Sequence, residues 1–401
     1  MTIESRGSSS STASNERCYM ATTSLRAAKS AKNDEYYTQL VDIENELRHY
    51  KDQLAGKVIF CNCDDPFESN FFKYFAMNFN QLGLKKLIAT CYDPSPIANT
   101  QISLFGDDVP VKHKGMKKFA NHAYKLELNQ VTDVDGSGSI GISDVEEMLK
   151  AEKEILKSGG KSSILTYLDG DGDFRSKECI GLLEQSDVIV TNPPFSLFRE
   201  YIEQLVTYDK KFLIIGNPNA LHYKEVFKLI QQGKLWLGYK KTGVDMLFDV
   251  PESFAQHLVK TKKEGSGYRV LNGKVLGRAS AVWFTNLDTT KRHEDVTGNL
   301  YKSYTPEEYL TYDNYPAIEV AKVSEIPEDY FGEMGVPDTF LEIYNPDQFE
   351  IIGIPFGNLG KEIGVTKNYR GRTDVSITKD GKTKCPYSRI IIKRKALNND
   401  N

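Results

Sequence analysis

The residues with the clearest chemical meaning in this 401-residue chain are Asn192-Pro193-Pro194-Phe195. The amino group of a nucleobase is a poor nucleophile because its lone pair is delocalised into the ring. Two acceptors that hold its two N–H groups would shift the nitrogen towards a tetrahedral, nucleophilic state. The side-chain oxygen of Asn192 and the carbonyl of Pro193 can be those acceptors, and the prolines, with fixed φ and no N–H, hold them rigid. Phe195 offers a flat surface on which a base can stack.

The segments on either side place this tetrapeptide between a strand and a helix. Residues 187–191 form a β-branched run that predicts a buried strand. Residues 196–206 have apolar side chains at helical spacing, with Ser196 as the predicted N-cap. The tetrapeptide would then lie at the carboxyl end of a strand, where open α/β sheets bind ligands. It resembles the motif of amino-group DNA methyltransferases, in which a flipped base lies beside S-adenosylmethionine; the alternative is a rigid turn with no chemical role.

The overall composition fits a large globular protein of the cytoplasm. With 40% hydrophobic and 26% charged residues, the chain can bury one large core or two ordinary ones. No apolar run reaches the length of a membrane span, and the six scattered cysteines indicate a reducing compartment. The net charge of −4 does not by itself indicate nucleic-acid binding, although a local basic surface is what a phosphate backbone would contact.

A β-α-β pattern precedes the catalytic candidate. Residues 57–63 read as a strand, residues 70–82 as a helix, and residues 86–92 as a second strand that ends at Asp93. In nucleoside-binding sheets, an acid at the end of the second strand typically accepts hydrogen bonds from ribose hydroxyls. Asp93 fits that role, and an ordinary solvated loop residue is the alternative. A helix predicted over residues 40–54 would pack on the sheet.

A second acidic loop follows another predicted strand, residues 124–131, and a polar insertion at about 132–167. The loop is Leu168-Asp169-Gly170-Asp171-Gly172-Asp173-Phe174-Arg175-Ser176, and a helix near 177–183 follows it. An acid after the third strand of such a sheet can accept the amino group of a cofactor adenine. We assign that role to Asp173, with Phe174 beside the purine ring; a plain flexible loop would show the same Asp/Gly alternation.

Further strands are expected at residues 211–217, 235–239 and 281–285, with a helix at 226–232. The stretch 240–280 reads as a hairpin-like excursion rich in lysine, arginine and glycine, which could contact phosphates or be a solvated face. From about residue 296, tyrosine and proline become frequent and the chain ends in a basic segment. We interpret this region as a smaller β-rich module, suited to phosphate and base-edge contacts or to packing alone.

The insertion carries a candidate calcium loop. Its oxygen ligands would sit at EF-hand spacing, with glycine at the sixth position for the turn. They are Asp133, Asp135, Ser137, the carbonyl of Ser139, and Asp144. The alternative is a Gly/Asp/Ser turn that leads into a helix over residues 144–156.

Together these motifs resemble the EcoRI-type family of adenine-specific DNA methyltransferases, from about residue 30 to 395. Lys32 to Thr38 is similar to the family's leading cofactor motif, and Asn62 to Pro66 stands where most methyltransferases have a Gly-rich cofactor loop. The resemblance implies S-adenosylmethionine, duplex DNA and base flipping. It assigns cofactor contacts to Asn33, Asp34, Tyr37, Thr38, Asn62, Asp64, Asp65, Pro66, Asp93, Asp173 and Phe174.

The expected protein is therefore an α/β enzyme with a Rossmann-like, doubly wound mixed sheet. We expect a disordered tail over residues 1–28, a catalytic domain over 29–295 and a target-recognition region over 296–401. We also expect a monomer that acts on double-stranded DNA, with a cognate restriction endonuclease as functional partner. Two alternatives remain open at this point: an amino-group methyltransferase acting on RNA or protein glutamine, and a catalytically inactive DNA-binding or calcium-responsive module.

Overall fold

The computed structural model describes residues 37–63, 65–67, 69–91, 123–134, 136–244, 246–250, 252–296 and 303–396. The predicted disordered tail, residues 1–28, lies outside these ranges. So do five of the predicted site residues: Asn33, Asp34, Asp64, Asp93 and Asp135. Of Tyr37, only the backbone is described.

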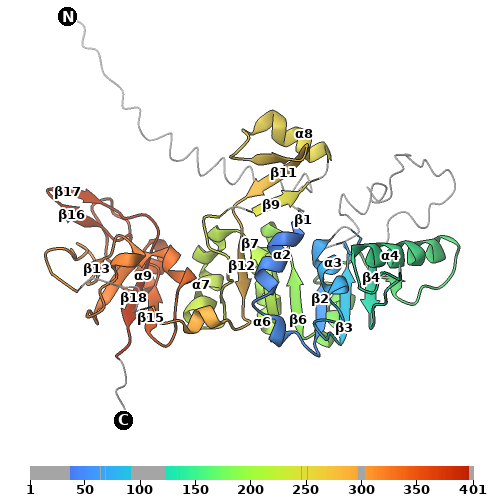
Figure 1. The fold of residues 1–401 in the computed structure, drawn as a ribbon. Helices are drawn as coiled ribbons and strands as arrows, with labels where there is room; N and C mark the ends of the chain where they lie inside the picture. Colours follow the sequence, from blue (N-terminus) through green and yellow to red (C-terminus); the bar gives the residue numbers. More distant parts are fainter. Residues whose placement is uncertain are drawn as a thin grey trace, which may run out of the picture.

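A mixed sheet of eight strands forms the centre of the protein (Figure 1). Its four central strands, β3, β2, β6 and β7, are parallel to one another. The strands outside them run antiparallel to their neighbours. In spatial order the strands are β5 (Leu165–Tyr167), β4 (Tyr124–Leu128), β3 (Lys86–Thr90), β2 (Val58–Cys61), β6 (Val188–Thr191), β7 (Lys211–Gly216), β12 (Val282–Thr285) and β8 (Trp236–Leu237).

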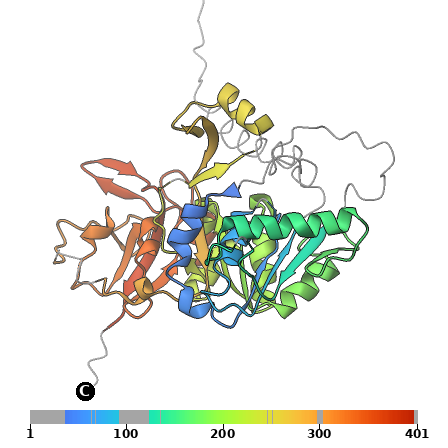
Figure 2. The same cartoon turned by 45° about the vertical axis from the view of Figure 1, so that its right-hand side comes forward.

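Helices cover both faces of this sheet (Figures 1 and 2). Alternate side chains of β2 separate two apolar clusters: Val58 and Phe60 join one, and Ile59 and Cys61 join the other. Successive side chains of a strand point to opposite faces of the sheet. Because both faces are covered by helices, every residue of β2 and β6 is buried. On one face lie α2 (Leu40–Leu47), α3 (Asn70–Met77) and α4 (Ile142–Lys157); on the other lie α5 (Lys177–Gln185), α6 (Phe198–Thr207) and α7 (Lys224–Gln231).

The connections diverge at the middle of the sheet. From β2 the chain passes to β3 on one side, whereas from β6 it passes to β7 on the other. The order of strands therefore reverses between β2 and β6, which are themselves paired in parallel. In open α/β sheets, ligands bind outside the carboxyl ends of the strands at such a point.

The excursion after β8 forms a small four-stranded sheet with the start of the described chain. Its strands, in order, are β1 (Tyr37–Thr38), β9 (Met246–Asp249), β11 (Lys274–Ala279) and β10 (Tyr268–Leu271), and α8 (Glu252–Thr261) packs on it. The prediction of a hairpin-like excursion is confirmed for β10 and β11, which pair antiparallel. The helix and the pairing with β1 were not predicted.

The C-terminal region is β-rich, as expected, but it shares a core with the main sheet. One continuous apolar cluster joins Val226 and Ile230 of α7 to Ile351 and Ile392 of the C-terminal sheet. That sheet has the order β13 (Ile318–Glu319), β14 (Glu333–Pro337), β18 (Arg389–Arg394) and β15 (Phe349–Gly353); beside it lie α9 (Gly357–Glu362) and a hairpin of β16 (Ile377–Lys379) and β17 (Lys382–Lys384).

Short 3-10 helices occupy several connections. They are η1 (Lys51–Gln53), η2 (Phe195–Leu197), η3 (Pro218–His222), η4 (Thr290–His293), η6 (Val323–Glu325) and η7 (Asp338–Glu342). Two predicted boundaries were wrong. The helix predicted to Leu54 ends at Leu47, although Leu54 is buried as its apolar character requires. The polar insertion ends earlier than residue 167, because Leu165–Tyr167 pairs with β4 at the sheet edge, where only Leu165 is buried.

Candidate active site

The two central strands β2 and β6 bring their following loops together. The backbone N–H of Cys63, after β2, donates to the Thr191 hydroxyl at the end of β6, at 3.2 Å. Asn62 and Asn192 are thus the first residues beyond two adjacent, parallel strands. Sequence reasoning placed Asn192 directly after its strand but included Asn62 in a strand over residues 57–63. The structure ends that strand at Cys61 and brings both asparagines to the same edge of the sheet.

The geometry of the Asn192 loop suits it to grip an amino group. Pro193 is buried and its neighbours Asn192, Pro194 and Phe195 are half-buried. The Pro194 carbonyl accepts a hydrogen bond from the Leu197 N–H at 3.0 Å. By contrast, no N–H or hydroxyl of the described residues donates to the Pro193 carbonyl, so that oxygen can accept from a ligand.

The chain after this loop turns through η2 before α6 begins. Ser196 was predicted as the N-cap of the helix, and this was wrong: it lies inside η2, and the N-cap of α6 is Leu197, which makes no side-chain cap. The predicted buried face of the helix is confirmed, because Phe198, Tyr201 and Ile202 are at most 2% exposed. Phe195 packs with part of its ring against the apolar cluster beneath the site.

A buried hydrogen bond ties α6 to the end of β2. The Tyr201 hydroxyl donates to the side-chain oxygen of Asn62, and Asn62 is 4% exposed. The Tyr201 ring meets the Phe174 ring edge-to-face at 5.0 Å between centroids. Tyr201 therefore touches residues of both predicted cofactor loops, although the sequence marked it only as one apolar position of a helix.

Asp65 shapes the turn that follows β2. Its carboxylate accepts the Phe67 N–H at 2.9 Å and the Tyr124 hydroxyl at 2.6 Å, and it is 6% exposed. Burial, followed by the nearby Asp65 charge, raises the pKa of Tyr124 well above its ordinary value. Pro66 lies in the same buried turn, and Ser69 caps α3 by accepting the Phe71 N–H at 3.1 Å. Asp65 has a clear structural role here.

The loop carrying Asp173 approaches the sheet edge closely. Gly172 has φ +78°, and a Cβ placed on it would lie 2.0 Å from the Cys91 carbonyl oxygen. Next to it, the Asp173 carboxylate accepts two hydrogen bonds from the Arg175 guanidinium, at 2.9 and 2.7 Å. The hydrogen bond from Arg175 lowers the pKa of Asp173, so the carboxylate is ionised at neutral pH. Its remaining lone pairs can accept further donors.

Phe174 was expected beside a purine ring, and the structure buries it. Only 5% of its surface is exposed, and it packs within the same apolar cluster as Ile189 of β6. The Arg175 guanidinium carbon lies 5.2 Å from the centre of its ring. In this structure Phe174 supports the loop from below.

Comparisons with known proteins decide which kind of site this is. Residues 24–395 match the family described as Adenine-specific methyltransferase EcoRI. The type II methyltransferase M.EcoRI of Escherichia coli is 41% identical over 378 residues, which cover 93% of this chain and 97% of that protein. This chain belongs to the EcoRI-type family of adenine-specific DNA methyltransferases. The resemblance drawn from the motifs is confirmed.

Two mycoplasma proteins extend the comparison. The type II methyltransferase M.MgeORF184P of Mycoplasma genitalium is 33% identical over 374 residues, covering 92% of this chain and 98% of its own. The type II methyltransferase M.MpnI of Mycoplasma pneumoniae is 33% identical over 375 residues, which cover 92% of this chain and 97% of that protein. No solved structure shows significant similarity to the chain. Among the described residues, no helix is both long and apolar enough to span a membrane.

A methyltransferase of this family depends on S-adenosylmethionine, and the residues present fit that cofactor. Thr38 is 2% exposed, and its hydroxyl oxygen is buried without a hydrogen-bond partner among the described residues. A buried hydroxyl without a partner costs about 1–3 kcal/mol, so a polar ligand that engages it is favoured. The Thr38 carbonyl accepts the Asn70 side-chain N–H at 2.7 Å, which holds this strand beside the start of α3.

The candidate calcium loop of this methyltransferase is not supported. Both carboxylates that the structure describes are occupied by backbone amides, because Asp133 accepts from Gly136, Ser137 and Gly138, and Asp144 accepts from Val134 and Gly141. The Ser139 carbonyl, another predicted ligand, accepts the Ser137 hydroxyl at 2.9 Å. Within the described ranges, no three His, Cys, Asp or Glu side chains are grouped to hold a metal ion. The helix expected over residues 144–156 is confirmed by α4.

We predict that Tyr201→Phe weakens cofactor binding in this methyltransferase. Loss of the hydroxyl leaves the buried Asn62 side-chain oxygen with only the weak Cys63 thiol as donor, at 3.6 Å, which should raise the Kd for S-adenosylmethionine by roughly tenfold. Calorimetric titration measures the affinity, and steady-state kinetics separates the change in KM from that in kcat. Tyr208→Phe is the matched control, because no described residue forms a hydrogen bond with the Tyr208 hydroxyl. Equal affinities of the two variants for S-adenosylmethionine would show that Tyr201 does not position the cofactor site.

Proposed function

We propose that this enzyme transfers a methyl group from S-adenosylmethionine to the exocyclic amino group of adenine at a defined site in duplex DNA. The observation that carries the proposal is the position of Asn192-Pro193-Pro194-Phe195 directly beyond β6, beside the end of β2. The Rossmann-like, doubly wound arrangement of a methyltransferase is the fold we assign to the sheet and its two helical layers. The target amine would donate one N–H to the Asn192 side-chain oxygen and the other to the Pro193 carbonyl.

Each residue of the tetrapeptide has a distinct part in this scheme. Asn192 and Pro193 supply the two acceptors, which are fixed before the base arrives and therefore need no reorganisation during the reaction. Pro194 fixes the direction of the chain and commits its own carbonyl to the Leu197 N–H. Phe195 offers its ring to the base, which must leave the duplex to reach the strand ends. Bound S-adenosylmethionine supplies the activated methyl group on its sulfonium.

The residues that would hold the cofactor surround the ends of β2 and β3. We propose that Thr38 and Asn62 contact it from β1 and β2, that Asp173 receives the adenine amino group, and that Asp65 and Phe174 support these loops from beneath. Support comes from the unpartnered Thr38 hydroxyl and from the spare acceptor capacity of the Asp173 carboxylate. The assignments of Asn33, Asp34, Tyr37, Asp64, Pro66 and Asp93 rest on the family resemblance.

We assign target recognition to the region from residue 296 onwards. Its basic and aromatic side chains are exposed on loops and on the β16–β17 hairpin, where phosphate and base-edge contacts are possible. These exposed side chains are Lys367, Tyr369, Arg370, Arg372, Lys379, Lys382, Lys384 and Tyr387. Tyr387 is 90% exposed, which is unusual for so large a ring outside an interface.

We further propose that the enzyme works as a monomer in the cytoplasm, as the modification partner of a cognate restriction endonuclease. The names of the three relatives, all type II methyltransferases, support a place in restriction–modification. No two of the five cysteines that the structure describes are joined in a disulfide bond, which suits a reducing compartment.

Expression in a methylation-free host, followed by modification-sensitive sequencing of its genome, tests the proposal. We expect methylated adenine at one short sequence at nearly every occurrence, and none in cells that express Asn192→Ala at the same level. Modified RNA or protein glutamine with unmodified DNA would contradict the proposal, as would methylation spread over unrelated adenines.

A further inference from the structure

The first described strand of the chain belongs to the small sheet, not to the main one. Tyr37 pairs with Asp249 and Thr38 with Phe248, which makes β1 one edge strand of the order β1-β9-β11-β10. We call residues 246–250 and 252–279, together with β1, the small module. Figure 1 shows it standing above the main sheet, with α8 at its far end. Thr38, proposed above to contact the cofactor, is thus a structural part of this module.

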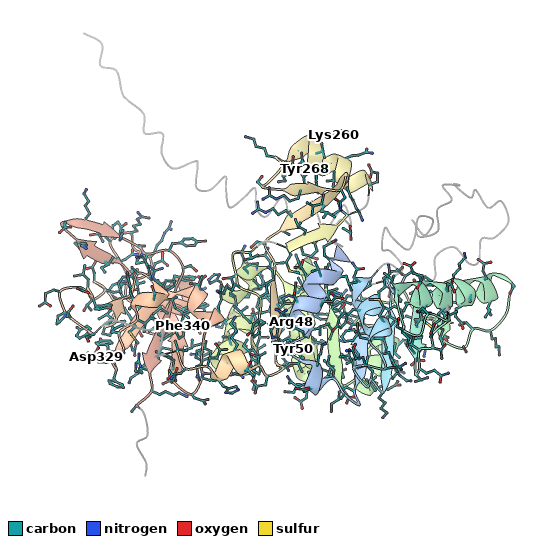
Figure 3. The ribbon with its side chains drawn as sticks, viewed as in Figure 1. Arg48, Tyr50, Lys260, Tyr268, Asp329 and Phe340 are labelled. Carbon is teal, nitrogen blue, oxygen red and sulfur yellow. The ribbon has the colours of Figure 1, made fainter. Side chains whose placement is uncertain are left out.

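The opposite edge of the small module is basic. Residues 246–279 contain six cationic side chains and three acidic ones, in a chain whose net charge is −4. One of the acids, Asp249, is already paired with Lys274 at 2.5 Å. Lys260, Lys262, Lys263 and Arg269 are exposed, and none of them forms an ion pair with a residue that the structure describes. Figure 3 shows Lys260 and Tyr268 on this module, well above the main sheet.

A cationic surface of this kind fits the phosphate backbone of duplex DNA. Each phosphate that a lysine or arginine neutralises releases a counterion, so such contacts strengthen binding without regard to sequence. The lysines are grouped at the end of α8 and the turn after it, where long flexible side chains can follow a backbone. The charge sits on the module that rises from the edge of the sheet where the target base must enter.

Asp249 lies in β9, between β1 and β11, and its carboxylate is held from both sides. Its carboxylate accepts one hydrogen bond from the Gln39 side chain at 2.7 Å, next to Thr38, and another from the Lys274 ammonium of β11. A second attachment holds the module to the main body, because the buried Glu46 of α2 accepts the Lys240 N–H at 2.9 Å where the chain enters the module. Strand β1 and the basic hairpin are therefore held as one unit.

We propose that the small module binds the DNA backbone and that, through β1, DNA binding and cofactor binding strengthen each other. This inference rests on the proposed function. DNA that holds the module in place also holds β1 and Thr38 in place, so the cofactor meets a strand already positioned. Coupling between two binding sites is reciprocal, and coupled sites commonly change each other's affinity by about 5–150-fold. Asp249 and Gln39 are the positioning residues of this device.

The DNA arm of the test uses two matched triple variants of the full chain. Lys260→Ala/Lys262→Ala/Lys263→Ala removes three charges from the module. Lys57→Ala/Lys85→Ala/Lys234→Ala removes three exposed lysines that precede β2, β3 and β8, on the opposite edge of the main sheet. We expect the first variant to reduce the slope of log Kd against log salt for a mixed-sequence duplex by about 3, and the second to leave it unchanged. Equal slopes in the two variants would overturn the proposed surface.

The coupling arm measures the Kd of S-adenosylhomocysteine by calorimetry, with and without a saturating duplex that carries the mapped methylation site. For the unaltered chain we expect the duplex to tighten cofactor-analogue binding by about tenfold. In Asp249→Ala, and in the milder Gln39→Ala, both ligands should still bind but the ratio should fall towards one. A ratio of one in the unaltered chain, or an unchanged ratio in both variants, would overturn the coupling.

Failure of this inference can be told apart from failure of the proposed function. If the genome of the expressing host carries no methylated adenine, the proposed function has failed. If methylation is present while the two triple variants bind DNA alike and the affinity ratio is one, only the inference has failed.

Discussion

Replacing Asn192 with alanine should lower kcat for adenine methylation by about a hundredfold or more. Removal of one preorganised polar group that acts on the reacting atoms typically costs this much. The side chain lies beyond β6, and the apolar residues of that strand are untouched by the change, so the fold and the affinity for S-adenosylmethionine should be largely retained. Single-turnover methylation of a duplex that carries the mapped site measures the chemical step directly.

A matched control separates this effect from a general disturbance of the strand end. Asn217 likewise follows a central parallel strand, β7, and its side chain caps η3 by accepting the Asn219 N–H at 2.9 Å. Asn217→Ala should lower stability while retaining most of the methylation rate. Near-normal turnover in Asn192→Ala would remove that residue from catalysis, whatever the control shows.

Gly172→Ala should disable the cofactor site more severely than any single contact to the cofactor. The new Cβ would lie 2.0 Å from the Cys91 carbonyl oxygen and 2.9 Å from the Ala123 Cβ, at a φ of +78° that side chains rarely adopt. The Cys91 carbonyl belongs to the backbone and cannot rotate away from the new Cβ as the end of a flexible side chain can. The loop that carries Asp173 must therefore move away from Cys91, after β3, and Ala123, before β4. We expect a loss of stability of roughly 2 kcal/mol or more and at least a tenfold weaker affinity for S-adenosylmethionine.

Gly170→Ala provides the control within the same loop. A Cβ on Gly170 would meet only the end of the Glu178 side chain, at 3.3 Å, and its φ lies outside the unfavourable region. Thermal unfolding and calorimetric titration of both variants would check the prediction. Similar cofactor affinities for the two would mean that the Asp173 loop does not form part of the cofactor site.

The sequence alone predicted those parts of the fold that depend on local pattern. The β-branched run before Asn192 became β6, and the helical spacing after it became the buried face of α6. The strand before Asn62 and the helix after it were predicted for the same reason, since period and propensity act over a few neighbouring residues. The proposed role of Asn192 was inferred from the chemistry of four adjacent residues and needs no long-range contact.

Features that depend on contacts between distant segments could not be predicted in this way. The Tyr201 hydroxyl reaches Asn62 across 139 positions of sequence, and Tyr201 looked like one more apolar residue of a helix. The edge strand β5 has too few buried residues to show a period, and β1 has only two residues. The candidate calcium loop, which the structure does not support, was inferred from ligand spacing, and spacing does not reveal whether backbone amides already occupy the carboxylates.

The shared core between α7 and the C-terminal sheet has a consequence for engineering new target specificities. Val226 and Ile230 of α7 pack in one apolar cluster with Ile351 and Ile392. The Gln231 side chain also donates to the Ile352 carbonyl at 2.6 Å. The C-terminal region therefore cannot be exchanged as an independent domain. A chimera that joins this catalytic sheet to the C-terminal region of a relative would bring together two half-cores that never evolved to fit. Under the proposed assignment of target recognition, replacing only the exposed residues of the β16–β17 hairpin, while keeping the buried Val375 and Ile377 that pack with Ile391 of β18, offers a route to altered recognition that retains this packing.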